Sequence, residues 1–105
     1  MSDATREQCW IINGIEVEPP PAGTDLERIR DLHHRFIDQL DDEGTLVAHG
    51  ATRDETGARS GTGLIVIRAA TRAEALAIAA REPYVVHGVR SLNLMPWQMQ
   101  RGRKG

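Results

Sequence analysis

The sequence GLIVIRAATRAEALAIAARE, residues 63–82, joins a short apolar strand to a helix and decides the fold. Residues 64–67 are apolar at every position, which is typical of a strand buried on both faces. Residues 71–74, Thr-Arg-Ala-Glu, form a capping box, the signature of a helix N-terminus. The proline after Glu82 disfavours helical geometry in that residue. We therefore predict a strand at 63–69 and a helix that ends near Glu82.

The first half of the chain repeats this pattern of a strand followed by a helix. Residues 9–17, CWIINGIEV, predict a strand that stops at three consecutive prolines. Thr24 and Glu27 have the spacing of a second capping box. Apolar residues then recur every three or four positions, which predicts a helix to about Glu43. Gly44 supplies the left-handed residue that ends this helix.

Two more strands complete the prediction. Residues 45–52 and 91–99 have strand composition, and Pro96 indicates an edge position or a bulge for the last strand. Residues 53–61 are polar and contain glycine, so they predict a flexible hairpin loop.

The order strand, helix, strand, strand, helix, strand predicts a ferredoxin-like βαββαβ α+β sandwich. Right-handed crossovers would place both helices on one face of a four-stranded antiparallel sheet. A chain of 105 residues holds a single domain with one small core. Residues 1–8 and 101–105 are expected to be flexible ends. Because two helices cover only one face, we expect the open face to pack on a second copy, giving a homodimer.

Composition excludes several classes of function. The net charge of −2 and the pI of about 6.1 leave no basic stripe for nucleic acid. No apolar run approaches the roughly 20 residues that span a bilayer, and residues 1–8 lack the apolar stretch of a signal peptide. We therefore expect no membrane partner and a cytoplasmic location. Cys9 is the only cysteine, and we interpret it as an inert packed thiol.

The histidine pair in the first helix contains the main candidate for chemistry. His33 lies four residues from both Ile29 and Ile37 and so faces the sheet, whereas His34 is turned about 100° toward solvent. A buried imidazole needs a hydrogen-bond partner, whether it is a satisfied core residue or a proton-transfer group. Arg30 adjoins this buried stripe, which suggests a nearby anion.

Glu82 is the candidate partner of His33. In the predicted sandwich the two helices lie side by side, so the carboxylate could orient and charge the imidazole for proton transfer. An ordinary exposed carboxylate is the alternative. A metal site of His33, His49 and Glu82 is a third interpretation, but no local ligand motif supports it, and we expect no metal.

The chain resembles the YCII family over residues 10–99. The resemblance rests on Arg30, His33, Asp42-Glu43-Gly44, His49-Gly50-Ala51, Glu82-Pro83-Tyr84, Gly88-Val89 and Pro96-Trp97. It implies a ferredoxin-like fold that dimerises into an α+β barrel, with a cleft that holds an acid/base dyad. Those roles fall to His33 and Glu82. Glu82 replaces the usual Asp, adding a methylene and about 1.5 Å of reach, and Ala51 replaces the usual Pro.

The resemblance also implies substrate-binding roles and no cofactor. Arg30 would clamp an anionic group, the Tyr84 phenol would donate to a substrate oxygen, and His49 belongs to the same set. One hypothesis is a cofactor-independent lyase or isomerase that acts on a small cyclic or aromatic acid. The alternatives are a non-catalytic metabolite-binding or accessory dimer and a structural domain of a larger assembly.

Overall fold

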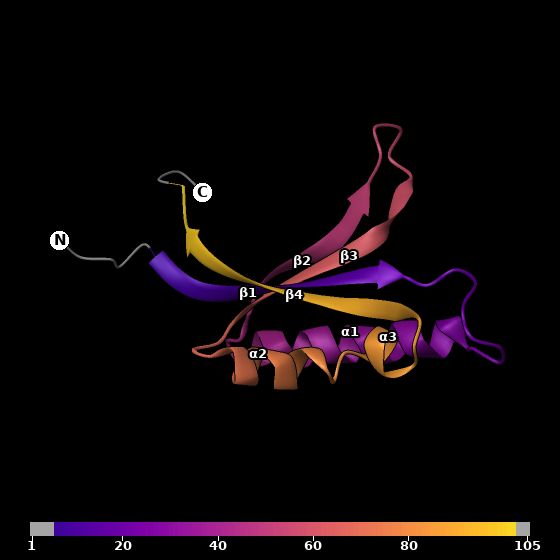
Figure 1. The fold of residues 1–105 in the computed structure, drawn as a ribbon, viewed down its shortest axis with the longest axis horizontal. Coiled ribbons are helices and arrows are strands. Elements are labelled where there is room, and N and C mark those ends of the chain that lie inside the picture. The colour runs from indigo at the N-terminus through magenta and orange to yellow at the C-terminus, as the bar shows by residue number, and fades with distance from the viewer. Residues whose placement is uncertain (1–5, 103–105) are drawn as a thin grey trace.

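The computed structural model describes residues 6–102 and confirms the ferredoxin-like fold. The elements are β1 Arg6–Glu16, α1 Leu26–Asp42, β2 Leu46–Arg53, β3 Arg59–Arg68, α2 Arg72–Ala79, α3 Pro83–Val86 and β4 Arg90–Gln100. The sheet has the order β2-β3-β1-β4, and all neighbouring strands are antiparallel. All three helices lie on one side of the sheet (Figure 1).

The main core lies between the sheet and the helices. Trp10 and Ile12 of β1 pair in register with Ile67 and Ile65 of β3, and all four face the helices. The remaining buried members are Phe36, Ile37, Leu40, Ala75, Ala79 and Leu94. The Trp10 indole Nε1 donates to the Ala69 carbonyl at 3.0 Å, so the largest ring in this core has its one donor satisfied.

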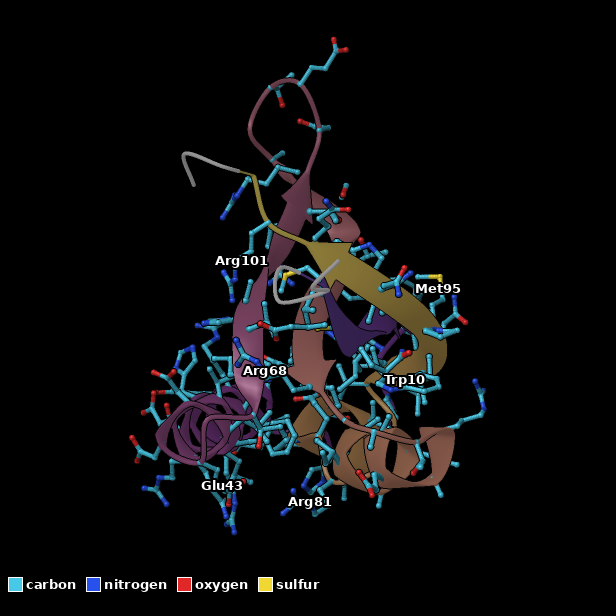
Figure 2. The ribbon with its side chains drawn as sticks, turned by 90° about the vertical axis from the view of Figure 1, so that its left-hand side faces the viewer. Trp10, Glu43, Arg68, Arg81, Met95 and Arg101 are labelled. Atoms are coloured by element: carbon cyan, nitrogen blue, oxygen red, sulfur yellow. The ribbon has the colours of Figure 1, made fainter. Side chains whose placement is uncertain are left out.

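The opposite face of the sheet is apolar and uncovered by any helix. Cys9, Val66 and Met99 form a separate buried cluster there. Figure 2 shows Trp10 on the helix side of the sheet and Met95 on the other side. Cys9 is fully buried, as predicted, and this burial raises the pKa of its thiol, with the Glu7 carboxylate adding to the effect. The uncovered face is called the open face below.

The first helix begins one residue later than its predicted capping box requires. Asp25, rather than Thr24, is the N-cap, and its Oδ1 accepts from the Arg28 backbone N–H at 3.1 Å. The Thr24 hydroxyl instead donates to the Pro21 carbonyl and closes the preceding turn. Asp is at least as good an N-cap as Thr, so the box prediction at this position was wrong. The left-handed Gly44, with φ 75°, ends the helix as predicted.

The second helix stops earlier than predicted and is followed by an unpredicted one. Thr71 accepts from the Glu74 N–H at 3.2 Å, which confirms this cap, although the Glu74 carboxylate reaches Ala70 rather than Thr71. Helix α2 ends at Ala79. Glu82 is extended (φ −63°, ψ 122°), because the following proline starts the four-residue helix α3.

Strand lengths also differ from the prediction. Strand β1 begins at Arg6, so residues 6–8, part of the expected flexible end, belong to a strand. The predicted loop at 53–61 is shorter, because β3 begins at Arg59. Asp54 closes the short turn by accepting from Thr56 and from the Ala58 N–H, and the Thr56 hydrogen bonds lower the pKa of this carboxyl. The predicted edge position of Pro96 is confirmed by the place of β4 in the sheet.

Residues 101–102 follow β4 without regular structure, and the rest of the predicted flexible ends, 1–5 and 103–105, lies outside the described residues. Within residues 6–102, no helix has both the length and the apolar character needed to cross a bilayer.

Candidate active site

A histidine of α1 and a glutamate from the break between α2 and α3 meet at the centre of the candidate site. The distance from His33 Nδ1 to Glu82 Oε1 is 2.5 Å. The exposed fractions of the two side chains are 13% and 2%, so the contact is shielded from bulk water. His33 takes its direction from the buried stripe of α1, where Ile29 and Ile37 flank it one turn away. The predicted orientation of His33 is confirmed, and the exposed alternative for Glu82 is wrong.

The break between α2 and α3 turns the Glu82 carboxylate inward. The extended backbone of Glu82 leaves α2, and its carbonyl accepts from both Val85 N–H and Val86 N–H at 2.9 Å, which anchors the start of α3. Glu82 is the one fully buried charged side chain among the described residues. A buried carboxylate without a partner is costly, and His33 supplies that partner.

Tyr84 packs beside this pair. Its ring centroid lies 4.9 Å from that of His33, and the ring is buried with Ile29 and Val89. Tyr84 is therefore a packed ring, and the hydrogen bond from its phenol to a substrate stays a prediction.

A pocket of about 290 Å³, called the His33 pocket below, opens beside the pair. It is lined by three histidines, His33, His34 and His49, and by four arginines, Arg30, Arg53, Arg59 and Arg90. Within residues 6–102, no Asp or Glu is among its lining residues. The pocket therefore has an excess of positive charge although the whole chain carries a net charge of −2.

The structure places the other predicted residues at the border of this pocket. Arg30 and His49 both line it, from α1 and β2, and both are exposed. Arg30, predicted to adjoin the buried stripe of α1, is exposed, and its position on the helix turns it toward the pocket. His49 does not join His33 and Glu82 in a ligand set: no cluster of three or more His, Cys, Asp or Glu suited to a metal ion occurs within residues 6–102.

One residue that the sequence did not reveal is Arg90, the first residue of β4. It is half-buried, and its guanidinium Cζ lies 4.1 Å from the centroid of the Tyr84 ring. Its Nε is buried and has no hydrogen-bond partner among the described residues. A single arginine at a strand start carries no local motif, so only the register of β4 against β1 could have pointed to it.

Comparisons with known proteins agree with this fold. Residues 15–98 match the YCII-related domain, which is most of the chain. The chain belongs to the YCII-related family. A similar solved structure is 5-chloro-2-hydroxyhydroquinone dehydrochlorinase from Burkholderia phenoliruptrix AC1100 in complex with 2,5-dihydroxybenzoquinone. The TM-score is 0.56 at 13% identity, covering 90% of this chain and 97% of that chain, which shows a shared fold. None of the curated proteins compared with the chain matches it.

For a YCII-related chain, the departure at Glu82 has a definite structural outcome. From the sequence alone, the extra methylene of Glu82 could either preserve or break its contact with His33. The distance of 2.5 Å shows that the longer side chain reaches the imidazole. A glutamate at position 82 therefore contacts the histidine in this chain.

Proposed function

We propose that this YCII-related protein is a cofactor-independent enzyme of the lyase or isomerase type that acts on a small, negatively charged cyclic or aromatic compound. The observation that carries this proposal is the shielded His33–Glu82 pair on the wall of a positively charged pocket. The pocket volume lies at the lower end of the range for ligand sites, which suits a compound with a single ring. The dehydrochlorinase of similar fold was solved with such a ring.

In this proposal His33 is the general base. An ionised carboxylate only accepts hydrogen bonds, so the contact with Glu82 keeps the proton on Nδ1 and leaves the lone pair on Nε2. Nε2 takes a proton from a substrate carbon, and Glu82 stabilises the imidazolium that forms. In an elimination, the electron pair of the broken C–H bond forms a double bond while a neighbouring leaving group departs with its own pair. In an isomerisation, the proton returns at another carbon.

Arg30, His49 and Tyr84 are the proposed substrate-binding residues. Arg30 and His49 approach the His33 pocket from two different elements and can hold the exposed edge of a ring. Tyr84 borders the inner end, next to His33. Donors placed where charge develops on a ring oxygen would stabilise the transition state more than the ground state.

The enzyme is proposed to act as a homodimer through the open face. Ile11 and Val47 extend the buried cluster of that face, and Met95 and Trp97 of β4 lie there with more than a third of their surface exposed. Asn13 Oδ1, on the same side, is buried without a partner among the described residues. An apolar face with an unsatisfied buried acceptor is stabilised by a second copy that covers both.

The alternative of a non-catalytic binding dimer has less support from the geometry. It would be favoured by a cleft closed by Phe36, Trp97 or Met95, with His33 and Glu82 far apart. Instead the pair is in contact, Phe36 lies in the core, and Trp97 faces away from the helices.

The test of catalysis is a substrate screen with matched histidine variants. Halogenated and hydroxylated aromatic acids and hydroquinones are incubated in D₂O, and both halide release and carbon-bound deuterium are followed by NMR and ion chromatography. For any compound that reacts, His33→Gln is expected to lower kcat by roughly 100- to 10,000-fold, because the base is lost. His87→Gln, at an exposed histidine that does not line the His33 pocket, should stay within about twofold. Undiminished turnover in His33→Gln would exclude His33 as the base.

A further inference from the structure

Two glycines face each other in the centre of the sheet, on the side that carries the helices. Gly14 of β1 pairs directly with Gly63 of β3. The preceding helix-side positions of β1 are Trp10 and Ile12, so the apolar layer stops where the glycines begin. Neither glycine has a positive φ, so backbone conformation does not require glycine at either position. Glycine inside a strand often marks the close approach of another group.

The group that approaches is the Arg90 side chain. A Cβ added at Gly14 would lie 2.8 Å from Arg90 Cδ, and one added at Gly63 would lie 2.7 Å from Arg90 Nη1. Both distances are shorter than real Cβ atoms show. The paired glycines therefore form a shallow trough in which the arginine lies across the sheet.

The trough holds a positive charge between the sheet and α3 that forms no ion pair with a carboxylate of residues 6–102. The Tyr84 ring lies 4.1 Å from Arg90 Cζ, on the helix side. Glu16, the residue opposite Arg90 in the β1–β4 register, pairs with Arg59 at 2.6 Å instead. Arg90 forms no ion pair within residues 6–102. A half-buried guanidinium with an unsatisfied Nε is costly unless an anion binds to it.

We propose that Arg90 is the anion-binding residue of the His33 pocket and pairs with a carboxylate or an ionised ring oxygen of the ligand. Tyr84 lies close to both His33 and Arg90: its ring centroid is 4.9 Å from that of the His33 ring and 4.1 Å from Arg90 Cζ. An oxygen held by Arg90 therefore brings the attached ring beside His33. In the shielded trough the guanidinium would also stabilise negative charge that develops when a proton leaves the ring.

This role differs from that of the exposed Arg30. Arg30 lies at the pocket opening, where water screens its charge, whereas Arg90 is half-buried and held by the glycine pair. The inference rests on the proposed function for its catalytic consequence, but anion binding is measured without turnover.

The first test is binding of a charged and a neutral probe of the same shape. Benzoate and its neutral isostere benzamide are titrated by calorimetry into the full-length chain and into Arg90→Met. The wild type should prefer benzoate, and Arg90→Met should weaken benzoate binding about 10- to 100-fold while leaving benzamide unchanged. Arg35→Met, the same substitution at an exposed site on α1, is the matched control and should bind like the wild type. A wild type without preference for benzoate, or an Arg90→Met variant that keeps it, overturns the proposal.

The second test moves the guanidinium instead of removing it. In Gly63→Ala the new methyl meets Nη1, the far end of a flexible side chain, so the sheet is retained while the guanidinium shifts. Benzoate binding should weaken about tenfold, and the urea midpoint should stay equal or rise, because alanine lowers unfolded-chain entropy. Adding Gly63→Ala to Arg90→Met should have no further effect on binding. An equal loss in both backgrounds means that the methyl blocks the ligand directly, which overturns the role of Arg90.

The outcomes separate this inference from the proposed function. If no compound is turned over but Arg90 still controls benzoate binding, the anion site stands and the catalytic proposal fails. If His33→Gln abolishes turnover while Arg90→Met binds benzoate normally, the catalytic proposal stands and the anion site fails.

Discussion

The layer between the sheet and the helices has two ends with opposite chemistry, although β1 and β3 run through both. At the apolar end, Trp10 and Ile12 pair with Ile67 and Ile65 and pack on helix side chains. At the glycine end, Gly14 pairs with Gly63, and the space holds Arg90, Tyr84 and the His33–Glu82 pair. Where β1 and β3 carry two opposed glycines instead of large side chains, the apolar core gives way to a pocket.

The two ends also contribute differently to stability. Burial at the apolar end yields about 25 cal/mol per Å² of apolar surface, and close packing makes each methylene count. At the glycine end, the buried Glu82 and the unsatisfied Arg90 Nε cost solvation free energy that only partners or a ligand offset. Stability is therefore concentrated at one end and chemistry at the other.

The largest expected effect is at the glycine end, in Glu82→Gln. The amide keeps the shape of the side chain but cannot stabilise an imidazolium on His33, so we expect kcat to fall roughly 100- to 10,000-fold. Steady-state kinetics with the compound found in the screen measures this. Glu82→Asp should retain more activity than the amide, because it keeps the charge. An amide variant as active as the wild type would show that the carboxylate has no catalytic role.

Substitutions at the apolar end should instead lower the free energy of unfolding. Ile67→Ala, at a fully buried position, should lower the free energy of unfolding by about 2–5 kcal/mol through lost burial and a residual cavity. Urea denaturation at fixed protein concentration measures it. Leu76→Ala, at a position 45% exposed on α2, is the control and should change stability by less than about 1 kcal/mol. Equal losses of unfolding free energy in the two variants would show that the buried position contributes no more to stability than the exposed one.

The open face is a third region, where we expect a substitution to weaken the proposed dimer. Trp97 is 40% exposed, and its β1 neighbour in register is the buried Cys9. A charge there, Trp97→Glu, should raise the dimer dissociation constant at least about 30-fold. Light scattering coupled to gel filtration measures the mass. Val86→Glu, at a 60% exposed position on α3, should leave the dissociation constant unchanged. A monomeric wild type would contradict the proposed dimer.

The smallest expected effect concerns pH and Cys9. Because burial raises the pKa of this thiol in the folded state, the folded chain holds the proton more tightly than the unfolded chain. The contribution to stability is full below the ordinary value of 9.0 and is lost as the pH rises from there to the folded pKa. Urea midpoints measured across this range should therefore fall more steeply for the wild type than for Cys9→Ala. Parallel curves would show that the thiol does not contribute.

Local sequence patterns predicted most of the fold because they report local physics. The run at 64–67, the cap at Thr71 and the helix end at Gly44 each depend on a few adjacent residues, and the structure agrees with them. The errors arose where two local solutions competed. Asp25 displaced Thr24 as the first cap, and Pro83 began a new helix in addition to ending the old one.

The site was predictable only in part. His33 could be placed by its spacing from Ile29 and Ile37, because helical period fixes which side chains share a face. Its contact with Glu82 depends on how α1 packs against the segment between α2 and α3, and the two residues are 49 positions apart in the chain, so spacing alone could not prove the contact. The exposure of Arg30 could not be predicted from its spacing, because a residue at the edge of a buried stripe can turn toward the core or toward solvent.

The sequence alone determined the order of the strands and of α1 and α2, and the inward direction of His33, since each follows from periodicity along one segment. The uncovered sheet face follows from that order, because right-handed crossovers place the helices on the same side. Only the tertiary structure decided that Glu82 reaches His33, that Gly14 and Gly63 oppose each other, and that Arg90 lies across them. These contacts join residues far apart in the chain. Strand register and helix packing set their distances, and a one-residue shift of register would turn every such side chain to the other face.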